Sequence, residues 1–276
     1  MKKKTKQKAT LAVKELFFWI LALVIIVPFL IVLFNAFKTK PESINMELSL
    51  PTVWHWENFK EVWETGNILN SLKNSLVLSV TSVGVCVFFS ALCSYVICRN
   101  RTKLNKFIYV YFAMGLMFPV SMVTIVKILK VIHLYDSLLG TILTCIALTL
   151  PLSVFLYYGF ISGIPKELDE AAVIDGAGAM SIFFRVIFPL LKPATVTIIM
   201  INFLNVWNDF SIPLYTLPDP NKAVIVQQVY NFYGTYTASW NLVSVTILFA
   251  ILPVLIVYLI GQKYIISGMV AGAVKG

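Results

Sequence analysis

The stretch Leu16–Phe37, LFFWILALVIIVPFLIVLFNAF, contains no charged residue. A bilayer core about 30 Å thick needs about 20 apolar residues in a helix, so this stretch has the length and composition of a membrane-crossing helix. A cleavable secretory signal has a shorter apolar core that is followed by a small-residue cleavage site. The residues that follow here include KTKPES (38–43), which offers no such site. We therefore expect the stretch to remain attached as a signal-anchor helix.

The rest of the chain has the same character. Its 276 residues are 59% hydrophobic and only 13% charged, and the mean hydropathy is +0.84, whereas soluble domains are about 25% charged. A water-soluble fold could not bury so much apolar surface. Five further uncharged runs each supply a crossing: Asn74–Cys98, Phe107–Val126, Ser137–Pro165, Pro193–Asn208 and Asn241–Gly261. The sequence therefore predicts an all-α integral membrane protein with six transmembrane helices.

The distribution of basic residues predicts the orientation in the membrane. With an even number of crossings and the N-terminus inside, roughly two thirds of the 22 Lys and Arg residues lie on inner segments, as the positive-inside rule expects. Both termini are then cytoplasmic, as a basic segment 1–15 and a tail 263–276 that flank the transmembrane domain 16–262. The outer loop 38–71 is expected to cap the outer mouth. The net charge of +9 is thus a topology signal, and we expect no nucleic-acid partner.

The cysteines give no sign of metal chemistry. All four lie in or at the edge of predicted spans, without a C-x-x-C spacing: Cys86, Cys93, Cys98 and Cys145. Buried cysteines in such places usually act as small apolar residues. The sequence therefore predicts no metal site and no cofactor bound by this chain.

One inner loop, residues 161–192, differs from the apolar remainder. Its segment Ile164–Pro193, IPKELDEAAVIDGAGAMSIFFRVIFPLLKP, carries four of the 13 acidic residues of the chain. Pro165 suits the first position of a helix, and three of the acids follow directly, where the helix dipole favours negative charge. Gly176 and Gly178 are placed to end that helix and turn the chain. The loop is thus predicted to form a short helix, followed by a second amphipathic piece that Pro189 and Pro193 interrupt.

One face of the predicted helix is small at its centre. Leu168, Ala171, Ala172 and Asp175 follow the i, i+3, i+4, i+7 spacing of a single face. The two alanines would let another surface approach the backbone closely. We therefore expect this face to contact something other than lipid.

The spacing of these residues resembles the EAA loop of ATP-binding-cassette (ABC) importer permeases. The family pattern is E-A-A, three residues, G, and a spacer that ends in an apolar residue and proline. It is matched here by Glu170-Ala171-Ala172, Gly176 and Ile187-Phe188-Pro189, with Phe188 where leucine is commoner. The resemblance implies that this loop contacts an ATPase. The residues it implicates in ATPase coupling are Glu170, Ala171, Ala172, Asp175 and Gly176.

The resemblance extends over nearly the whole chain. NSLKNSLVLS (Asn70–Ser79), WNDF (Trp207–Phe210) and the tail GQKYIISGMVAGAVKG (Gly261–Gly276) are similar to the carbohydrate, maltose-type branch. The ending GAVKG is more specific for the second of the two permease partners in that branch. The resemblance implies a type I ABC importer permease fold in the bacterial cell membrane.

The same resemblance implies a set of partners. These are a sister permease in a heterodimer, two cytoplasmic ABC ATPase subunits and an extracellular or periplasmic solute-binding protein. Since the chain has no G-x-x-x-x-G-K-[ST] phosphate loop, we expect ATP and Mg to bind to the partner ATPase, and this chain not to be an enzyme. The loop 161–192 would then be the coupling element that docks in the ATPase.

A candidate substrate path lies in the fifth predicted span. Asn202, Asn205 and Asp209 fall on one helical face, with Asn208 beside them. Polar groups within a span usually face protein or a water-filled cavity, because burial in lipid without partners is costly. Two interpretations remain open: these residues bind a hydroxyl-rich ligand, or they form hydrogen bonds from helix to helix.

Other functional classes fit the sequence less well. A self-sufficient carrier or channel would show ionisable residues at the membrane midplane, and the sole candidate is Asp209, near an outer boundary. A membrane-embedded enzyme would need paired acid–base or nucleophilic residues inside the spans, which the sequence does not supply. Within the importer class, glycerol-phosphate or another polar solute remains an alternative to a sugar.

Overall fold

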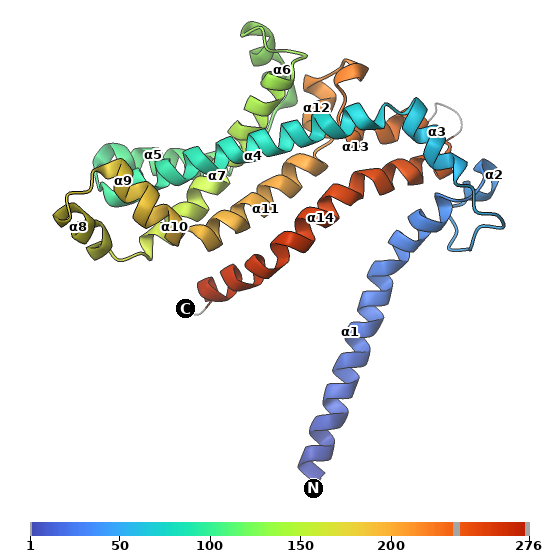
Figure 1. Ribbon diagram of the computed structural model, residues 1–276, viewed down its shortest axis with the longest axis horizontal. Coiled ribbons are helices and arrows are strands. Elements are labelled where there is room, and N and C mark those ends of the chain that lie inside the picture. The colour runs from blue at the N-terminus through green and yellow to red at the C-terminus, as the bar shows by residue number, and fades with distance from the viewer. Residues whose placement is uncertain (1, 234–237, 274–276) are drawn as a thin grey trace. The chain divides into compact units, whose positions relative to one another are not determined.

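The computed structural model describes residues 2–233 and 238–273, which fold into two compact units. Unit 1 comprises Met1–Leu69 and Gln228–Ile251, and unit 2 comprises Asn70–Gln227 and Leu252–Gly276. The named elements of the described residues are all helices (Figure 1). The predicted all-α class is therefore confirmed for the part of the chain that the structure describes.

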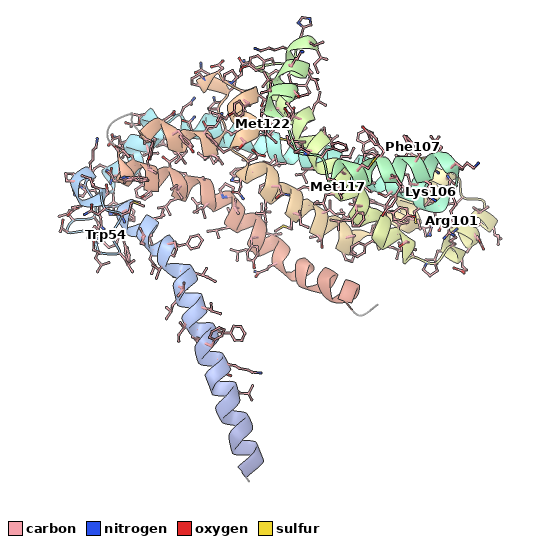
Figure 2. All side chains as sticks on the ribbon, turned by 180° about the vertical axis from the view of Figure 1, so that it is seen from behind. Trp54, Arg101, Lys106, Phe107, Met117 and Met122 are labelled. Atoms are coloured by element: carbon pink, nitrogen blue, oxygen red, sulfur yellow. The ribbon has the colours of Figure 1, made fainter. Side chains whose placement is uncertain are left out.

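Unit 1 holds the first long helix and most of the predicted outer loop. Its helices are α1 (Lys2–Asn35), α2 (Lys40–Ser43), α3 (Glu57–Thr65), the 3-10 turn η3 (Val229–Phe232) and the first part of α14 (Trp240–Ala273). The loop is fixed by Asn58, whose side-chain amide donates 2.9 Å hydrogen bonds to the carbonyls of Ala36 and Lys38. Trp54, labelled in Figure 2, and Trp56 both pack edge-on against Phe37. These contacts order the segment that follows α1.

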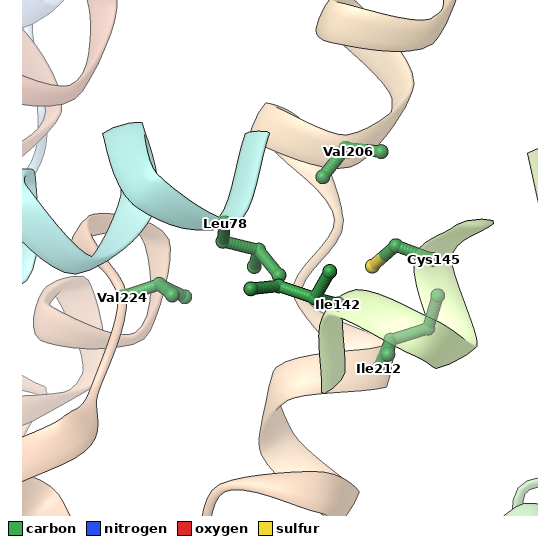
Figure 3. Close-up of a cluster of buried hydrophobic side chains, with 6 residues drawn as sticks. All are labelled: Leu78, Ile142, Cys145, Val206, Ile212 and Val224. Carbon is green, nitrogen blue, oxygen red and sulfur yellow. The ribbon is translucent and has the colours of Figure 1, made fainter. Parts of the chain in front are cut away.

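Unit 2 contains the remaining elements. They are α4 (Ile68–Arg99), α5 (Lys103–Gly115), α6 (Met122–Val131), α7 (Leu138–Ser162), α8 (Glu167–Ile174), α9 (Ala179–Ile182), the π-helix η1 (Phe183–Ile187), α10 (Phe188–Leu190), α11 (Lys192–Asn208), α12 (Ser211–Thr216), the 3-10 turn η2 (Pro220–Lys222), α13 (Ile225–Gln228) and the rest of α14. Four of these helices, α4, α7, α11 and α12, and the residue before α13 contribute six buried apolar side chains to one cluster (Figure 3): Leu78, Ile142, Cys145, Val206, Ile212 and Val224.

A buried polar seam ties α4 to α7. The hydroxyl of Ser94 donates to the carbonyl of Val154 at 3.0 Å, and the thiol of Cys86 donates to the hydroxyl of Ser153 at 3.3 Å. Small side chains of this kind let membrane helices approach closely and bond across the gap. Cys86, like Cys98 and Cys145, is a buried free cysteine, as the sequence predicts, whereas Cys93 is only half-buried.

Four helical stretches of the described residues are long and apolar enough to cross a membrane: Phe17–Asn35, Ile68–Arg99, Leu138–Ser162 and Trp240–Gln262. They correspond to the first, second, fourth and sixth predicted spans. A fifth crossing is formed if the bent pair Ala179–Leu190 and Lys192–Asn208, at 76° to each other, counts as one. The structure thus supports four or five crossings by length and composition.

The third predicted span, Phe107–Val126, differs from the prediction of one helix. Two short helices, α5 and α6, share this segment and are separated by residues 116–121. Pro119 lies in the break, and a proline removes a backbone donor and disfavours helix in the residue before it. Phe107 and Met117 of this segment, both labelled in Figure 2, have 63% and 84% of their surface exposed.

The bend in the fifth crossing lies between the two prolines that the sequence singles out. Pro189 has no N–H to donate to the carbonyl one turn earlier, and the preceding residues Phe183–Ile187 form a π-helix. The chain then turns at Leu191 and resumes as α11, with Pro193 near its first position. At the other end of the chain, α14 continues through Ala273 into the segment predicted as a tail. Residues 274–276 of that predicted tail lie outside the described residues.

Candidate functional site

Helix α8 forms from the local signals that the sequence carries. It covers Glu167–Ile174, with the three predicted acids in its first turn, where they complement the helix dipole. The backbone N–H groups of Asp169 and Glu170 both donate to the carbonyl of Lys166, which is the N-cap. Pro165 therefore precedes the cap rather than occupying the first helical position.

The end of α8 is set by Gly176. Its φ of +79° lies in the left-handed region, which glycine adopts without steric cost. The N–H of Gly176 donates to the carbonyl of Val173 at 3.0 Å, and that of Ala177 donates to Ala172 at 2.9 Å. These bonds satisfy carbonyls that the helix end would otherwise leave free. Gly178 has a φ of −74°, so the predicted turn is confirmed but depends on Gly176 alone.

The outer surface of α8 is uncovered. No residue of this fully described helix is buried, and Glu170, Ala171 and Asp175 are all exposed. Apolar side chains share this exposure, including Leu168 at 41% and Ile174 at 86%. The chain itself therefore leaves this surface of α8 available to another molecule.

The opposite side of α8 is held by a polar cluster that sequence reasoning missed. Both oxygens of Asp169 are used: the hydroxyl of Tyr95 donates to Oδ1 at 2.7 Å, and Nη2 of Arg99 lies 2.8 Å from Oδ2. The second contact is an ion pair without the alignment of a hydrogen bond. Nη1 of Arg99 also donates to the carbonyl of Ile164 at 3.1 Å, just before α8.

Burial separates this cluster from ordinary surface ion pairs. The side chains of Arg99 and Asp169 are only 11% and 17% exposed. They border a cavity of about 330 Å³ that is lined also by Lys166, Glu170 and Val173. The four-residue spacing of Tyr95 and Arg99 puts them on one face of α4, but only the folded chain shows that Asp169 faces them.

The candidate substrate residues separate into two groups. Asn202 is 1% exposed, and its amide donates to Ser153 Oγ at 2.7 Å and to Cys86 Sγ at 3.7 Å. It therefore joins α11 to α7 and α4, as the helix-to-helix interpretation describes. Asn208 is exposed and donates to the carbonyl of Leu204 in its own helix.

Asn205 and Asp209 lie together on a small cavity. They line a volume of about 190 Å³ with Cys145, Thr149 and other residues. Oδ1 of Asp209 accepts a 2.9 Å hydrogen bond from the N–H of Ile212, which anchors the start of α12. Hydroxyl, amide and carboxylate groups thus meet at one place, and this set can exchange hydrogen bonds with a polyhydroxylated solute.

Comparisons with known proteins agree with these features. Residues 87–270 match the family described as binding-protein-dependent transport system inner membrane component. MelC of Bacillus subtilis, a melibiose/raffinose/stachyose import permease protein, is 36% identical over 91% of this chain and 91% of its own length. AmyC of Thermoanaerobacterium thermosulfurigenes, a probable starch degradation products transport system permease protein, is 33% identical over 93% of this chain and 94% of its own.

A solved structure has the same fold. One chain of a bacterial ABC transporter involved in the import of the acidic polysaccharide alginate aligns with a TM-score of 0.81 and 20% identity, over 94% of this chain and 97% of that one. The matched family segment includes α8 and most of the polar seam. The chain therefore belongs to the family of inner membrane components of binding-protein-dependent transport systems.

Proposed function

We propose that this chain is the permease subunit of an ATP-driven importer and forms half of the translocation path for a sugar or oligosaccharide. The observation that carries the proposal is the uncovered helix α8, with Glu170 and Asp175 exposed and its end fixed by Gly176. A helix so exposed contributes little to the chain's own stability, so its surface is available to a second subunit. The sugar as substrate class is supported by the similarity to MelC and AmyC, whose names refer to melibiose, raffinose, stachyose and starch degradation products.

Energy for uphill transport has to come from a partner, because the sequence contains no phosphate loop. The proposed partners are a sister permease, two cytoplasmic ABC ATPase subunits that hold ATP and Mg, and an external solute-binding protein. The coupling residues are Glu170 for a charged contact, Ala171 and Ala172 for close packing, Asp175, and Gly176 for the turn. Closure of the ATPase pair would move α8 and, with it, the membrane helices.

The proposed topology has six crossings of the bacterial cell membrane, with both termini in the cytoplasm. In this arrangement the bent pair that contains α11 is the fifth crossing, and α5 with α6 is a broken third one. The roughly two-to-one excess of basic residues on the inner segments supports the orientation.

The substrate path is proposed to include Asn205 and Asp209, which share one cavity. Asn202, which is bonded to a neighbouring helix, and Asn208, which is exposed and bonded within its own helix, remain proposed members of the path. No cationic side chain lines the cavity among its described residues, and a carboxylate repels a phosphorylated solute. This observation favours a neutral sugar over glycerol-phosphate.

The test uses the complex as it exists in the cell. This chain would be expressed with the products of the neighbouring genes, purified as an assembly and reconstituted in liposomes. Candidate oligosaccharides, supplied with the binding protein, should stimulate ATP hydrolysis and accumulate inside. Accumulation of solute by this polypeptide alone, without ATP, would refute the proposal. So would chemical labelling that places residues 166–178 outside intact cells.

A further inference from the structure

Helix α8 is held to the membrane helices in an unusual way. None of its residues is buried, and the side chains of Leu168, Val173 and Ile174 are 41%, 60% and 86% exposed. Apolar burial, the usual source of attachment for a surface helix, is therefore slight. Its position depends on other contacts.

Besides the contacts of α8 with α9 and η1, its polar side-chain contacts converge on two residues at the end of α4. The hydroxyl of Tyr95 bonds to Oδ1 of Asp169, and Nη2 of Arg99 pairs with Oδ2 at 2.8 Å. Nη1 of the same guanidinium bonds to the carbonyl of Ile164 at 3.1 Å. The guanidinium of Arg99 thus contacts both α8 and the segment that leads into it. Two points of attachment restrict rotation as well as separation.

The cluster is largely shielded from solvent. The side chains of Arg99 and Asp169 are only 11% and 17% exposed, so breaking the pair would leave a largely buried charge without its partner. Nε of Arg99 is also buried and has no hydrogen-bond partner within the described residues. Tyr95 packs against Phe183 of η1, with ring centroids 5.4 Å apart, which fixes the ring that aims the hydroxyl.

We propose that Tyr95, Arg99 and Asp169 are positioning residues that make α8 and the cytoplasmic end of α4 move as one element. This inference rests on the proposed coupling function of α8. A displacement of α8 would then be delivered first to α4 and, through the buried contacts of Ser94 and Cys86 with α7, to the helices beside the candidate path. We name this cluster the α4–α8 tether. Its proposed role is to transmit the displacement of α8 to α4, without contact with ATP or solute.

The test compares variants that differ only in the tether. Asp169→Asn keeps the shape and the acceptor for Tyr95 but removes the charge that pairs with Arg99. Glu167→Gln, on the same helix, removes an exposed charge that makes no ion pair within the described residues and serves as the matched control. The double variant Arg99→Asp with Asp169→Arg restores the pair with its signs exchanged.

The readout is the amount of solute imported per ATP hydrolysed by the reconstituted complex. Coupling free energies correspond to about 5–150-fold changes, and we expect a drop of about tenfold in this ratio for Asp169→Asn. Glu167→Gln should keep the ratio, and the double variant should regain part of it. A role in folding alone would lower the yield of complex without changing the ratio.

Two results would overturn the inference. One is an Asp169→Asn complex whose ratio equals that of Glu167→Gln. The other applies if Asp169→Asn fails to insert in the membrane. Tyr95→Phe, which removes only one hydroxyl, is then the test: a lowered ratio supports the tether, and an unchanged ratio refutes it. Absence of solute-stimulated hydrolysis in the unmutated complex would instead refute the proposed function.

Discussion

Alanine in place of Gly176 should weaken coupling by a measurable amount. The backbone there has a φ of +79°, and a residue with a Cβ pays about 1–2 kcal/mol for the left-handed region. No atom lies within 4 Å of the place where that Cβ would stand, so backbone strain is the whole cost. Since 1.4 kcal/mol is a factor of ten, the native turn after α8 should lose about 5–30-fold in its population relative to competing conformations.

Gly178 provides a matched control two residues away. A Cβ there also meets nothing within 4 Å, but its φ of −74° suits any residue. Gly178→Ala should therefore behave like the unmutated chain. Gly176→Pro should be worse than Gly176→Ala, because proline fixes φ near −65° and removes the N–H that donates to the carbonyl of Val173.

The assay is solute uptake by cells that carry the whole transport system, normalised to the amount of this chain in the membrane. ATP hydrolysis by the purified complex is measured alongside. We expect uptake to fall in the order Gly178→Ala, Gly176→Ala, Gly176→Pro. Equal uptake by the two alanine variants, or normal uptake by a well-inserted Gly176→Pro variant, would refute the argument that this turn positions the coupling helix.

Three further predictions concern other parts of the chain. Glu170→Lys reverses an exposed charge on α8 and should abolish uptake while immunoblots show normal membrane insertion; normal uptake would contradict this. Asn202→Val removes a buried 2.7 Å hydrogen bond and should cost about 1–3 kcal/mol of stability, seen as a lower unfolding temperature in detergent, whereas the exposed Asn208→Ala should change it little. The hydrogen bond that Lys222 donates to Asp136 raises the pKa of that lysine. The stability that this interaction contributes is therefore complete below the ordinary lysine pKa and is lost as pH rises through the raised value. Lys222→Met should remove this part of the fall in unfolding temperature at alkaline pH.

Local signals allowed parts of the fold and site to be predicted from sequence. The acidic first turn of α8 and the glycine at its end are decided by residues within a few positions of each other. Uncharged runs likewise identify crossings, because hydropathy is a property of the segment itself. Such features need no knowledge of the tertiary arrangement.

The tether could not be predicted in this way. Tyr95 and Arg99 lie about 70 residues before Asp169, and nothing in the order of the residues shows that they meet. Arg99 contributes to the predicted orientation only as one more inner basic residue. The two interpretations of Asn202 also stay open in the sequence, since a buried amide that bonds to a neighbouring helix has the same spacing as one that faces a cavity.

The break within the third predicted span shows a different limit. Phe107–Val126 is uncharged throughout, so a hydropathy window counts it as one helix. Whether Pro119 bends a helix or ends it depends on what satisfies the freed backbone groups. In the structure the chain leaves the helix at Leu116 and starts another at Met122.

The stretch Phe17–Asn35 of α1 has a practical consequence for handling the protein. Its most apolar window has none of its residues buried in this chain. In this chain without its partners, detergent would have to cover the apolar surface of this helix once lipid is removed, and loss of that detergent would expose a surface that can bind another copy. Preparations of this chain should therefore aggregate through α1 first. Reconstitution in a nanodisc should keep them monodisperse, whereas a detergent that forms small micelles should not.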